Sequence, residues 1–217
     1  EIPLRLVGSE MCIRDRICSP KRYIIISSPI IFTNNPIHPP DRILSGFRHM
    51  NSRINTNSIA FIGLCNEFCV AVENTRESTR EEFTDRMLRL LPRIYIAATD
   101  LTIDTPEYTE PYIDNVLEED YYDAVRRNME TLFGEDDMYL EVFEEDMKYS
   151  DTPVAASISE GLADIFQVLY NFINTAREAT DETLATALMA VRDDFRAYWS
   201  ASLCNVLRAL NHLKMNS

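Results

Sequence analysis

Glycine is scarce in this chain, with 5 residues among 217. Because glycine supplies the backbone conformations that tight β-turns need, its scarcity favours a helical chain over an all-β one. Phosphate-binding loops, dinucleotide-binding turns and the nucleophile elbow of serine hydrolases also require glycines at fixed spacing, and none of these motifs is present. We therefore assign no catalytic residue and no cofactor from such motifs.

Histidine is rarer still, with 3 residues, and His212 is the one histidine after residue 50. A di-iron bundle needs two Glu-x-x-His pairs, but Ala209 stands three residues before His212. The His-Glu-x-x-His spacing of zinc hydrolases is absent as well. Arg208 and His212 resemble the Arg/His motif of helical ribonuclease-like domains, but their spacing is one residue short. We interpret His212 as a surface residue near the negative end of a helix dipole.

Basic residues are outnumbered, with 21 lysines and arginines against 35 acidic residues and a net charge of −14. This balance argues against nucleic acid and anionic membranes as partners, since both require a basic surface. No apolar run reaches the roughly 20 residues that a membrane-spanning helix needs. The composition is typical of a soluble protein that is kept apart by self-repulsion, or of one that meets a basic partner.

The five cysteines are an odd number in a chain that is not small. A disulfide framework is therefore not expected, and free thiols in a reducing cytoplasm are the simpler interpretation. Cys65 and Cys69 are four residues apart and share a helix face. Together they could supply half of the ligands of a metal site. No second half with suitable spacing exists, so we expect both to pack as small apolar side chains.

The chain changes character near Met50. Residues 1–49 carry seven basic and four acidic side chains, whereas residues 50–217 carry 14 and 31. The stretch "GSEMCIRDR" resembles a translated sequencing adapter, and the segment after it resembles read-through of sequence upstream of a gene. We expect a helical domain at 50–217 behind a non-native segment at 1–49; the alternative is a genuine disordered extension that starts at Met11.

Apolar residues recur at helical spacing through most of residues 50–217. Ser58 is the expected N-cap of the first helix, capping boxes at Ser78–Glu81 and Thr79–Glu82 open the second, and Gly134 ends the third. The pattern predicts an all-α, single-domain bundle of about five helices with a long C-terminal helix. The expected helices are Ser58–Glu73, about 79–98 with Pro92 inside, Glu118–Phe133, Pro153–Ala179 with Thr152 as its cap, and Asp181–Leu213 with Tyr198 and Ser202 facing inward.

The most acidic stretch, residues 135–153, raises the question of a metal site. Carboxylates are the ligands that Mg²⁺ prefers, and all-α nucleotide pyrophosphatases hold it with Glu-x-x-Glu followed by Glu-x-x-Asp. Glu141 and Glu144 match the first half. Glu160 and Asp164 share a helix face but are four residues apart, so the second half fails. These four residues are the candidate metal ligands of an alternative function, a Mg²⁺-dependent hydrolase of nucleotides or other phosphorylated small molecules.

Aromatic residues in the same stretch suggest contacts with a protein partner. Tyr139 and Phe143 lie within the acidic segment, and Tyr149 and Asp151 belong to the motif "YSDTP". These four residues are the candidate partner contacts, whereas Trp199 is expected in the core. The leading hypothesis is a cytoplasmic, non-enzymatic protein-interaction module.

Three segments carry a resemblance to a known family: "YSDTPVAASISE" at residues 149–160, which is the most specific, "FTDRMLRLLPRIYIAA" and "VRDDFRAYWSASLCNVLRALNHL". With them, the chain resembles a bacterial family, domain of unknown function 5063. The resemblance spans about residues 58–213 and implies a small, cytosolic, mostly helical protein. It implies no activity and no catalytic residue.

Overall fold

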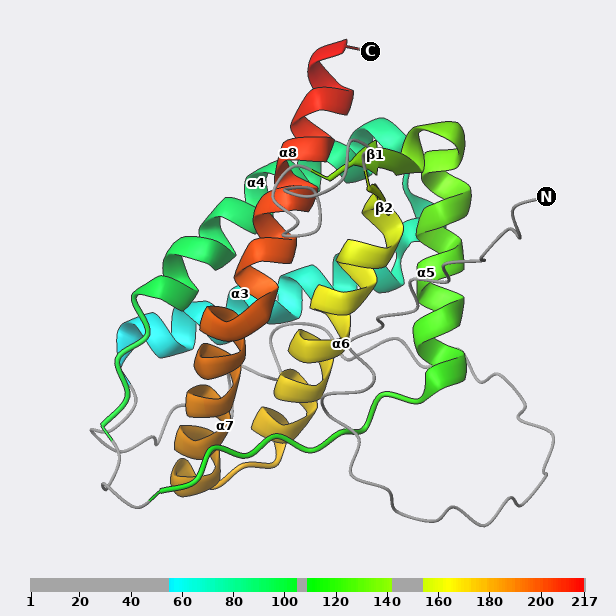
Figure 1. Cartoon of the computed structure of the whole chain (residues 1–217). Helices are drawn as coiled ribbons and strands as arrows, with labels where there is room; N and C mark the ends of the chain where they lie inside the picture. Colours follow the sequence, from blue (N-terminus) through cyan, green and yellow to red (C-terminus); the bar gives the residue numbers. More distant parts are fainter. Residues whose placement is uncertain (1–54, 105–108, 142–153, 217) are drawn as a thin grey trace, which may run out of the picture. The chain divides into compact units, whose positions relative to one another are not determined.

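The computed structural model describes residues 55–104, 109–141 and 154–216. The chain divides into two units, Glu1–Pro36 and Ile37–Ser217, and every described residue belongs to the second. The expected boundary at residue 50 lies outside the described residues. Those residues form a mostly α-helical domain, as the sequence predicts, with one small two-stranded sheet that it does not predict (Figure 1).

Two helices, α3 (Thr56–Glu73) and α4 (Arg80–Thr99), are joined by a short 3-10 turn, η2 (Thr75–Glu77). The prediction that Ser58 caps α3 is wrong. Asn55 is the cap, and its side-chain oxygen accepts hydrogen bonds from the Ser58 backbone at 2.8 Å and the Ser58 hydroxyl at 3.1 Å. Ser58 is buried within the first turn because the helix begins two residues before it. The predicted Thr79–Glu82 capping box of α4 is confirmed.

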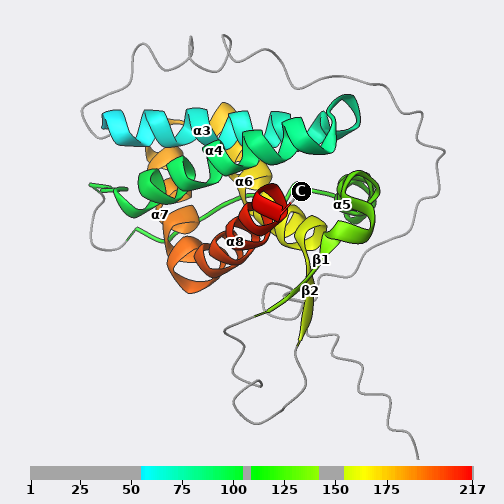
Figure 2. The ribbon, with the colours of Figure 1, turned by 90° about the horizontal axis from the view of Figure 1, so that it is seen from above.

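Helix α5 (Glu119–Phe133) ends at Gly134, whose φ of +58° lies in the left-handed region that favours glycine. A 3-10 turn, η3 (Gly134–Asp137), leads into strand β1 (Met138–Leu140). Strand β2 (Ala155–Ser157) pairs with β1 in antiparallel register, Tyr139 lying opposite Ala156. We call this pair the ribbon, and it extends from the helical bundle in Figure 2.

Helix α6 (Ile158–Arg177) begins later than predicted. The prediction of Thr152 as its cap is wrong, because the Ser157 hydroxyl caps it by accepting from the Glu160 backbone at 3.0 Å. The physical reason is the ribbon. Residues 155–157 are extended against β1, so the helix starts only after that strand ends.

The long C-terminal helix is confirmed, but it contains an irregular turn. Helix α7 (Asp181–Asp194) continues through η5, a π-helical segment (Phe195–Trp199), into α8 (Ser200–Asn216). The Ser200 N–H donates to the Phe195 carbonyl five residues back. A π turn holds one extra residue, so the inward side advances by one position. Leu203 is buried where the sequence predicted Ser202, and Trp199 is buried fully while Tyr198 beside it is half-buried.

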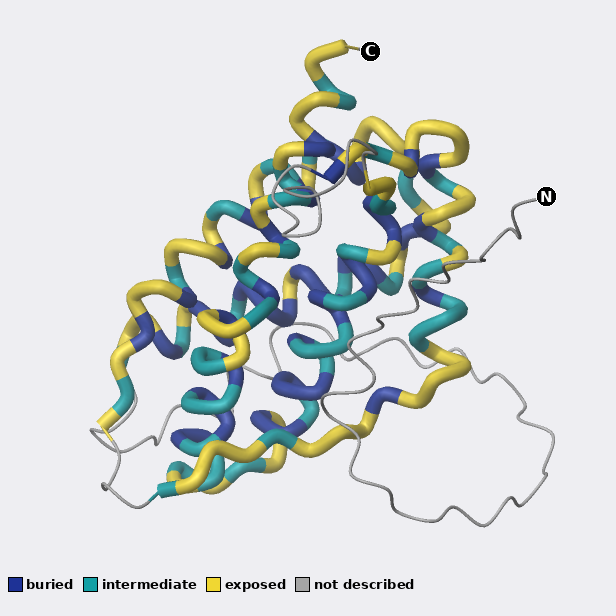
Figure 3. Tube along the Cα trace, viewed as in Figure 1, coloured by how far each residue is buried: buried dark blue, intermediate teal, exposed yellow. Residues whose placement is uncertain are grey.

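The core lies around α6, which packs against α3, α5, α7 and α8, while α4 packs on α3 and α8. Buried residues line the sides of these helices that face one another, and the last turns of α8 are exposed (Figure 3). Trp199 is fully buried, as predicted, and its indole N–H donates to the Val191 carbonyl at 3.2 Å. Among the described helices, none combines the length and apolar character of a membrane span.

An irregular segment before α5, residues 109–118, crosses α7 and α6 in Figure 1. The buried Asn171 side chain accepts from the Val116 and Leu117 backbones at 3.0 and 2.9 Å. Thr175 accepts from the Asp114 backbone at 3.0 Å. These hydrogen bonds satisfy backbone groups that would otherwise be desolvated without a partner, and they hold α5 in place.

Candidate functional site

Polar side chains from six parts of the chain gather where the ribbon meets α5, α6 and α8. Three tyrosine hydroxyls interact there with acidic groups, and Glu160 acts electrostatically on all three. We call this group the tyrosine–carboxylate cluster. Its members are Tyr122 on α5, Tyr139 on β1, Glu141 after β1, Glu160 and Asp164 on α6, Tyr198 on η5 and Arg208 on α8.

Asp164 is held by two of the tyrosines. Tyr122 donates to one carboxylate oxygen at 2.7 Å and Tyr198 to the other at 3.0 Å. Burial raises the pKa of Asp164, and the two hydrogen bonds oppose part of that rise. Burial, and next the charge of Asp164, raise the pKa of both tyrosines far above the ordinary value, so their hydroxyls stay protonated and donate. Asp164 therefore joins three helices through fixed hydrogen bonds.

The inner face of the ribbon is attached to α8. The guanidinium carbon of Arg208 lies 5.9 Å from the centre of the Tyr139 ring. The same side chain donates to the Leu140 carbonyl at 2.8 Å. The Tyr139 hydroxyl faces Glu141 at 3.4 Å, and the Glu141 N–H continues the pairing by donating to the Val154 carbonyl at 2.8 Å. Tyr139 and Glu141 thus point toward the helices.

A second attachment lies at the start of α6. The buried Asp137 accepts from the Ser159 backbone at 2.8 Å and from the Ser159 hydroxyl at 2.7 Å. A carboxylate at a helix N-terminus is favoured by unpaired N–H groups and by the helix dipole. Sequence reasoning missed this contact because Asp137 is one of three consecutive acidic residues, and only Asp137 is buried.

The outer face of the ribbon has a different character. Alternation along a strand places Met138 and Leu140 on the side opposite Tyr139, together with Ala155 across the ladder. Met138 is 58% exposed and Leu140 is 59% exposed. We call these three residues the outer ribbon face. Ser157 lies opposite Met138 on the same side, where its hydroxyl caps α6, so the exposed part of this face is apolar. The inner face holds it in a fixed orientation.

The structure describes four of the eight candidate site residues. Glu141, Glu160 and Asp164 all join the tyrosine–carboxylate cluster, and so does Tyr139. The other four candidates, Phe143, Glu144, Tyr149 and Asp151, lie outside the described residues.

The described part of the chain contains no complete set of ligands for the predicted metal site. There, no three His, Cys, Asp or Glu side chains form a group that would hold a metal ion. Both carboxylate oxygens of Asp164 accept from tyrosines, and Glu160 is exposed. Because Glu144 is not described, the four-carboxylate site stays a prediction.

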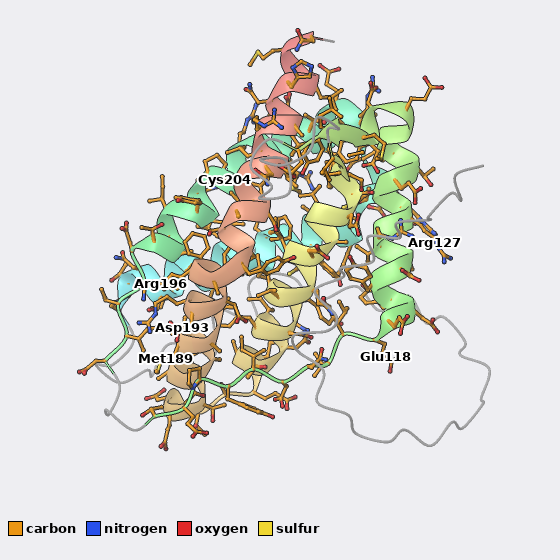
Figure 4. All side chains as sticks on the ribbon, viewed as in Figure 1. Glu118, Arg127, Met189, Asp193, Arg196 and Cys204 are labelled. Atoms are coloured by element: carbon orange, nitrogen blue, oxygen red, sulfur yellow. The ribbon has the colours of Figure 1, made fainter. Side chains whose placement is uncertain are left out.

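The cysteines are free thiols within the described residues. Cys65 and Cys69 are fully buried on α3, as their spacing predicts, and burial raises the pKa of both. A buried thiol with a raised pKa is a poor nucleophile and a poor metal ligand. Cys204 is exposed on α8, where Figure 4 labels it.

Comparison with known proteins agrees with this fold. The family described as "Domain of unknown function (DUF5063)" matches residues 52–216. The chain belongs to the DUF5063 family. Its match includes every described helix and both strands of the ribbon. The family description names no activity, so any function for this DUF5063 domain has to be argued from its geometry.

A solved structure gives the same architecture. The crystal structure of protein BF1032 from Bacteroides fragilis superposes with a TM-score of 0.63 at 28% sequence identity. The alignment covers 74% of this DUF5063 chain and 93% of the Bacteroides chain. The search of curated proteins gave no match.

Proposed function

We propose that this DUF5063 domain is a non-enzymatic protein-interaction module and that its docking surface is the outer ribbon face. One observation carries the proposal: Met138 and Leu140 are both more than half exposed on a ribbon whose opposite face is attached to the helices. Single exposed apolar residues are ordinary on protein surfaces. Two long aliphatic side chains on one face of a sheet are less so, because a sheet buries its apolar face against another layer.

The attachment of the inner face supports this function. A two-stranded ribbon is marginally stable alone in water. Here Arg208 and the Asp137–Ser159 contact fix it at both ends of β1. A partner that binds the outer face therefore meets a preformed surface and loses less conformational entropy on binding.

Charge defines the chemistry of the partner. Glu135 and Asp136 lie exposed in the turn that leads into β1, and the chain as a whole carries −14. We infer a protein partner that presents aliphatic side chains flanked by lysine or arginine. The apolar part would cover Met138 and Leu140, while the basic residues would face the acidic surroundings and speed association.

We also propose that the protein works in a reducing compartment. Cys204 is an exposed free thiol, and Cys65 and Cys69 are free thiols in the core. Thiols persist in this state where glutathione and thioredoxin keep them reduced, as in the cytoplasm. The partner is accordingly expected in the same compartment.

The test is affinity capture with the full chain in three forms. The first is the unmodified chain and the second carries Met138→Asp and Leu140→Asp. The third carries Ile96→Asp and Met215→Asp, which remove two exposed apolar side chains of 61% and 71% exposure from other surfaces. We expect one stoichiometric protein to bind the first and third forms and to be lost from the second. Cross-linking should then place a basic–apolar segment of that protein on the ribbon.

The proposal fails if the captured protein binds all three forms equally. It also fails if the full chain is a dimer in solution and the Met138→Asp/Leu140→Asp form is a monomer, because the outer ribbon face would then serve self-association. Far-ultraviolet circular dichroism should show equal helix content in all three forms, because the four substituted side chains are exposed.

A further inference from the structure

A surface depression of about 460 Å³ lies along the seam between α3 and α4, and no residue of the ribbon lines it. It contains three arginines of α4, Arg86, Arg89 and Arg93, which we call the arginine row. Their spacing of three and four residues puts them on one face of the helix. The remaining lining residues are Glu67, Glu82, Asp85 and Leu90.

Two of the lining carboxylates are already engaged. Glu82 belongs to the capping box of α4, where one of its oxygens accepts from the Thr79 backbone at 3.0 Å and the Thr79 hydroxyl at 2.9 Å. Asp85 pairs with Lys214 of α8 at 3.0 Å. Both acidic groups therefore serve contacts that hold the helices, and neither forms an ion pair with the arginine row in the described residues.

The arginines are less engaged than the carboxylates beside them. Arg93 reaches Glu67 only at 3.9 Å, and both side chains are more than half exposed. Arg86 acts on Glu82 electrostatically without a hydrogen bond, and Arg89 has no ion pair or hydrogen bond with any described residue. Guanidinium groups bind oxyanions through paired N–H donors, so the row offers free donors at fixed spacing.

We propose that the arginine row binds a compact small molecule that carries two or more phosphate groups. The depression has a volume in the range typical of small-ligand sites. A long polyanion such as nucleic acid would extend past the row onto a surface that belongs to a chain of net charge −14, which repels it. A compact polyphosphate can bridge the guanidinium groups of the row, and two of the three carboxylates that line the depression are held by Thr79 and Lys214. This site is separate from the ribbon and does not depend on the function proposed for it.

The test is isothermal titration calorimetry of the full chain with sodium tripolyphosphate at constant ionic strength. The test variant carries Arg86→Gln and Arg89→Gln. The matched control carries Arg126→Gln and Arg127→Gln, which removes the same charge from α5, where both side chains form surface ion pairs and Arg127 points to solvent (Figure 4). We expect the control to bind like the unmodified chain and the test variant to bind at least about tenfold more weakly. Arg89→Gln alone is the variant of choice if the double substitution lowers the helix content.

Three results would overturn the proposal. The first is no heat of binding in the unmodified chain. The second is an equal loss of affinity in the test and control variants, which would show a general effect of charge. The third is tighter binding of citrate than of tripolyphosphate, which would assign the row to carboxylates instead of phosphates.

Discussion

Arg208 lies across the ring of Tyr139 and hydrogen-bonds the next residue of the same strand. The two contacts measure 5.9 Å from guanidinium carbon to ring centre and 2.8 Å from nitrogen to the Leu140 carbonyl. One side chain of α8 therefore attaches β1 through both a ring and a backbone oxygen. The orientation of the outer ribbon face depends on this attachment.

Replacement of that arginine should loosen the ribbon without unfolding the bundle. For Arg208→Gln we expect about 1 kcal/mol less stabilisation of the ribbon, because an exposed cation–π contact and one charged hydrogen bond are lost. Amide hydrogen exchange at Tyr139 and Glu141 should become roughly fivefold faster, while amides of α6 stay unchanged. The control is Arg196→Gln, since Arg196 is exposed and makes no ion pair or hydrogen bond within the described residues. Unchanged exchange in Arg208→Gln would contradict the attachment.

Two glycines offer a matched test of helix packing. A Cβ at Gly161 would lie 2.5 Å from a methyl group of Val206, whereas a Cβ at Gly63 would meet nothing within 4 Å. Gly161→Ala should lower the free energy of unfolding by about 1–3 kcal/mol, because α6 and α8 would have to move apart. Gly63→Ala should raise it by about 0.5–1 kcal/mol, because alanine loses less entropy in a helix. Urea denaturation followed by circular dichroism measures both, and equal effects would show that the α6–α8 distance adjusts freely.

The contribution of Asp164 to the free energy of unfolding should decrease as the pH rises. Its folded-state pKa is raised by burial above the ordinary value of 3.8, so the folded state holds this proton more tightly than the unfolded state. The stability that the protonated form contributes is fully present when the pH is below the ordinary pKa. It is lost as the pH rises through the raised pKa of the folded state. Asp164→Asn removes this titration. The unfolding free energy of the unmodified chain, minus that of the variant, should fall across this window, and a constant difference would contradict the raised pKa.

Asn171 should hold the segment before α5. In Asn171→Ala, the Val116 and Leu117 N–H groups lose their acceptor, and we expect a loss of about 1–3 kcal/mol in unfolding free energy. Asn174→Ala is the control, because Asn174 donates to the Tyr170 carbonyl of its own helix. That substitution should cost no more than about 0.5 kcal/mol. A larger loss in Asn174→Ala than in Asn171→Ala would contradict the assignment.

The sequence predicted the ends of helices correctly where a single residue type determines the end. Glu82 follows Thr79 at capping-box spacing, and Gly134 takes a backbone conformation that other residues avoid. The start of α6 was mispredicted because Thr152 and Ser157 are both competent caps. The choice between them depends on strand pairing with β1, which the local sequence does not encode.

The candidate site was predictable only in part. Tyr139, Glu141, Glu160 and Asp164 were singled out from their chemistry, and the fold brings all four together. The donors to Asp164 were not foreseen, since Tyr122 and Tyr198 are 42 and 34 residues away along the chain. The face on which Tyr139 lies was also undetermined, because it depends on the register of the ribbon.

The π segment at Phe195–Trp199 has a consequence for comparing relatives of this chain. A π turn accommodates one extra residue while the helix on either side keeps its orientation. A homologue that is one residue shorter at this point can therefore form an unbroken α-helix in which the counterparts of Val191 and Leu203 still face the core. A one-residue alignment gap within 195–199 should leave the inward residues on both sides of it unchanged.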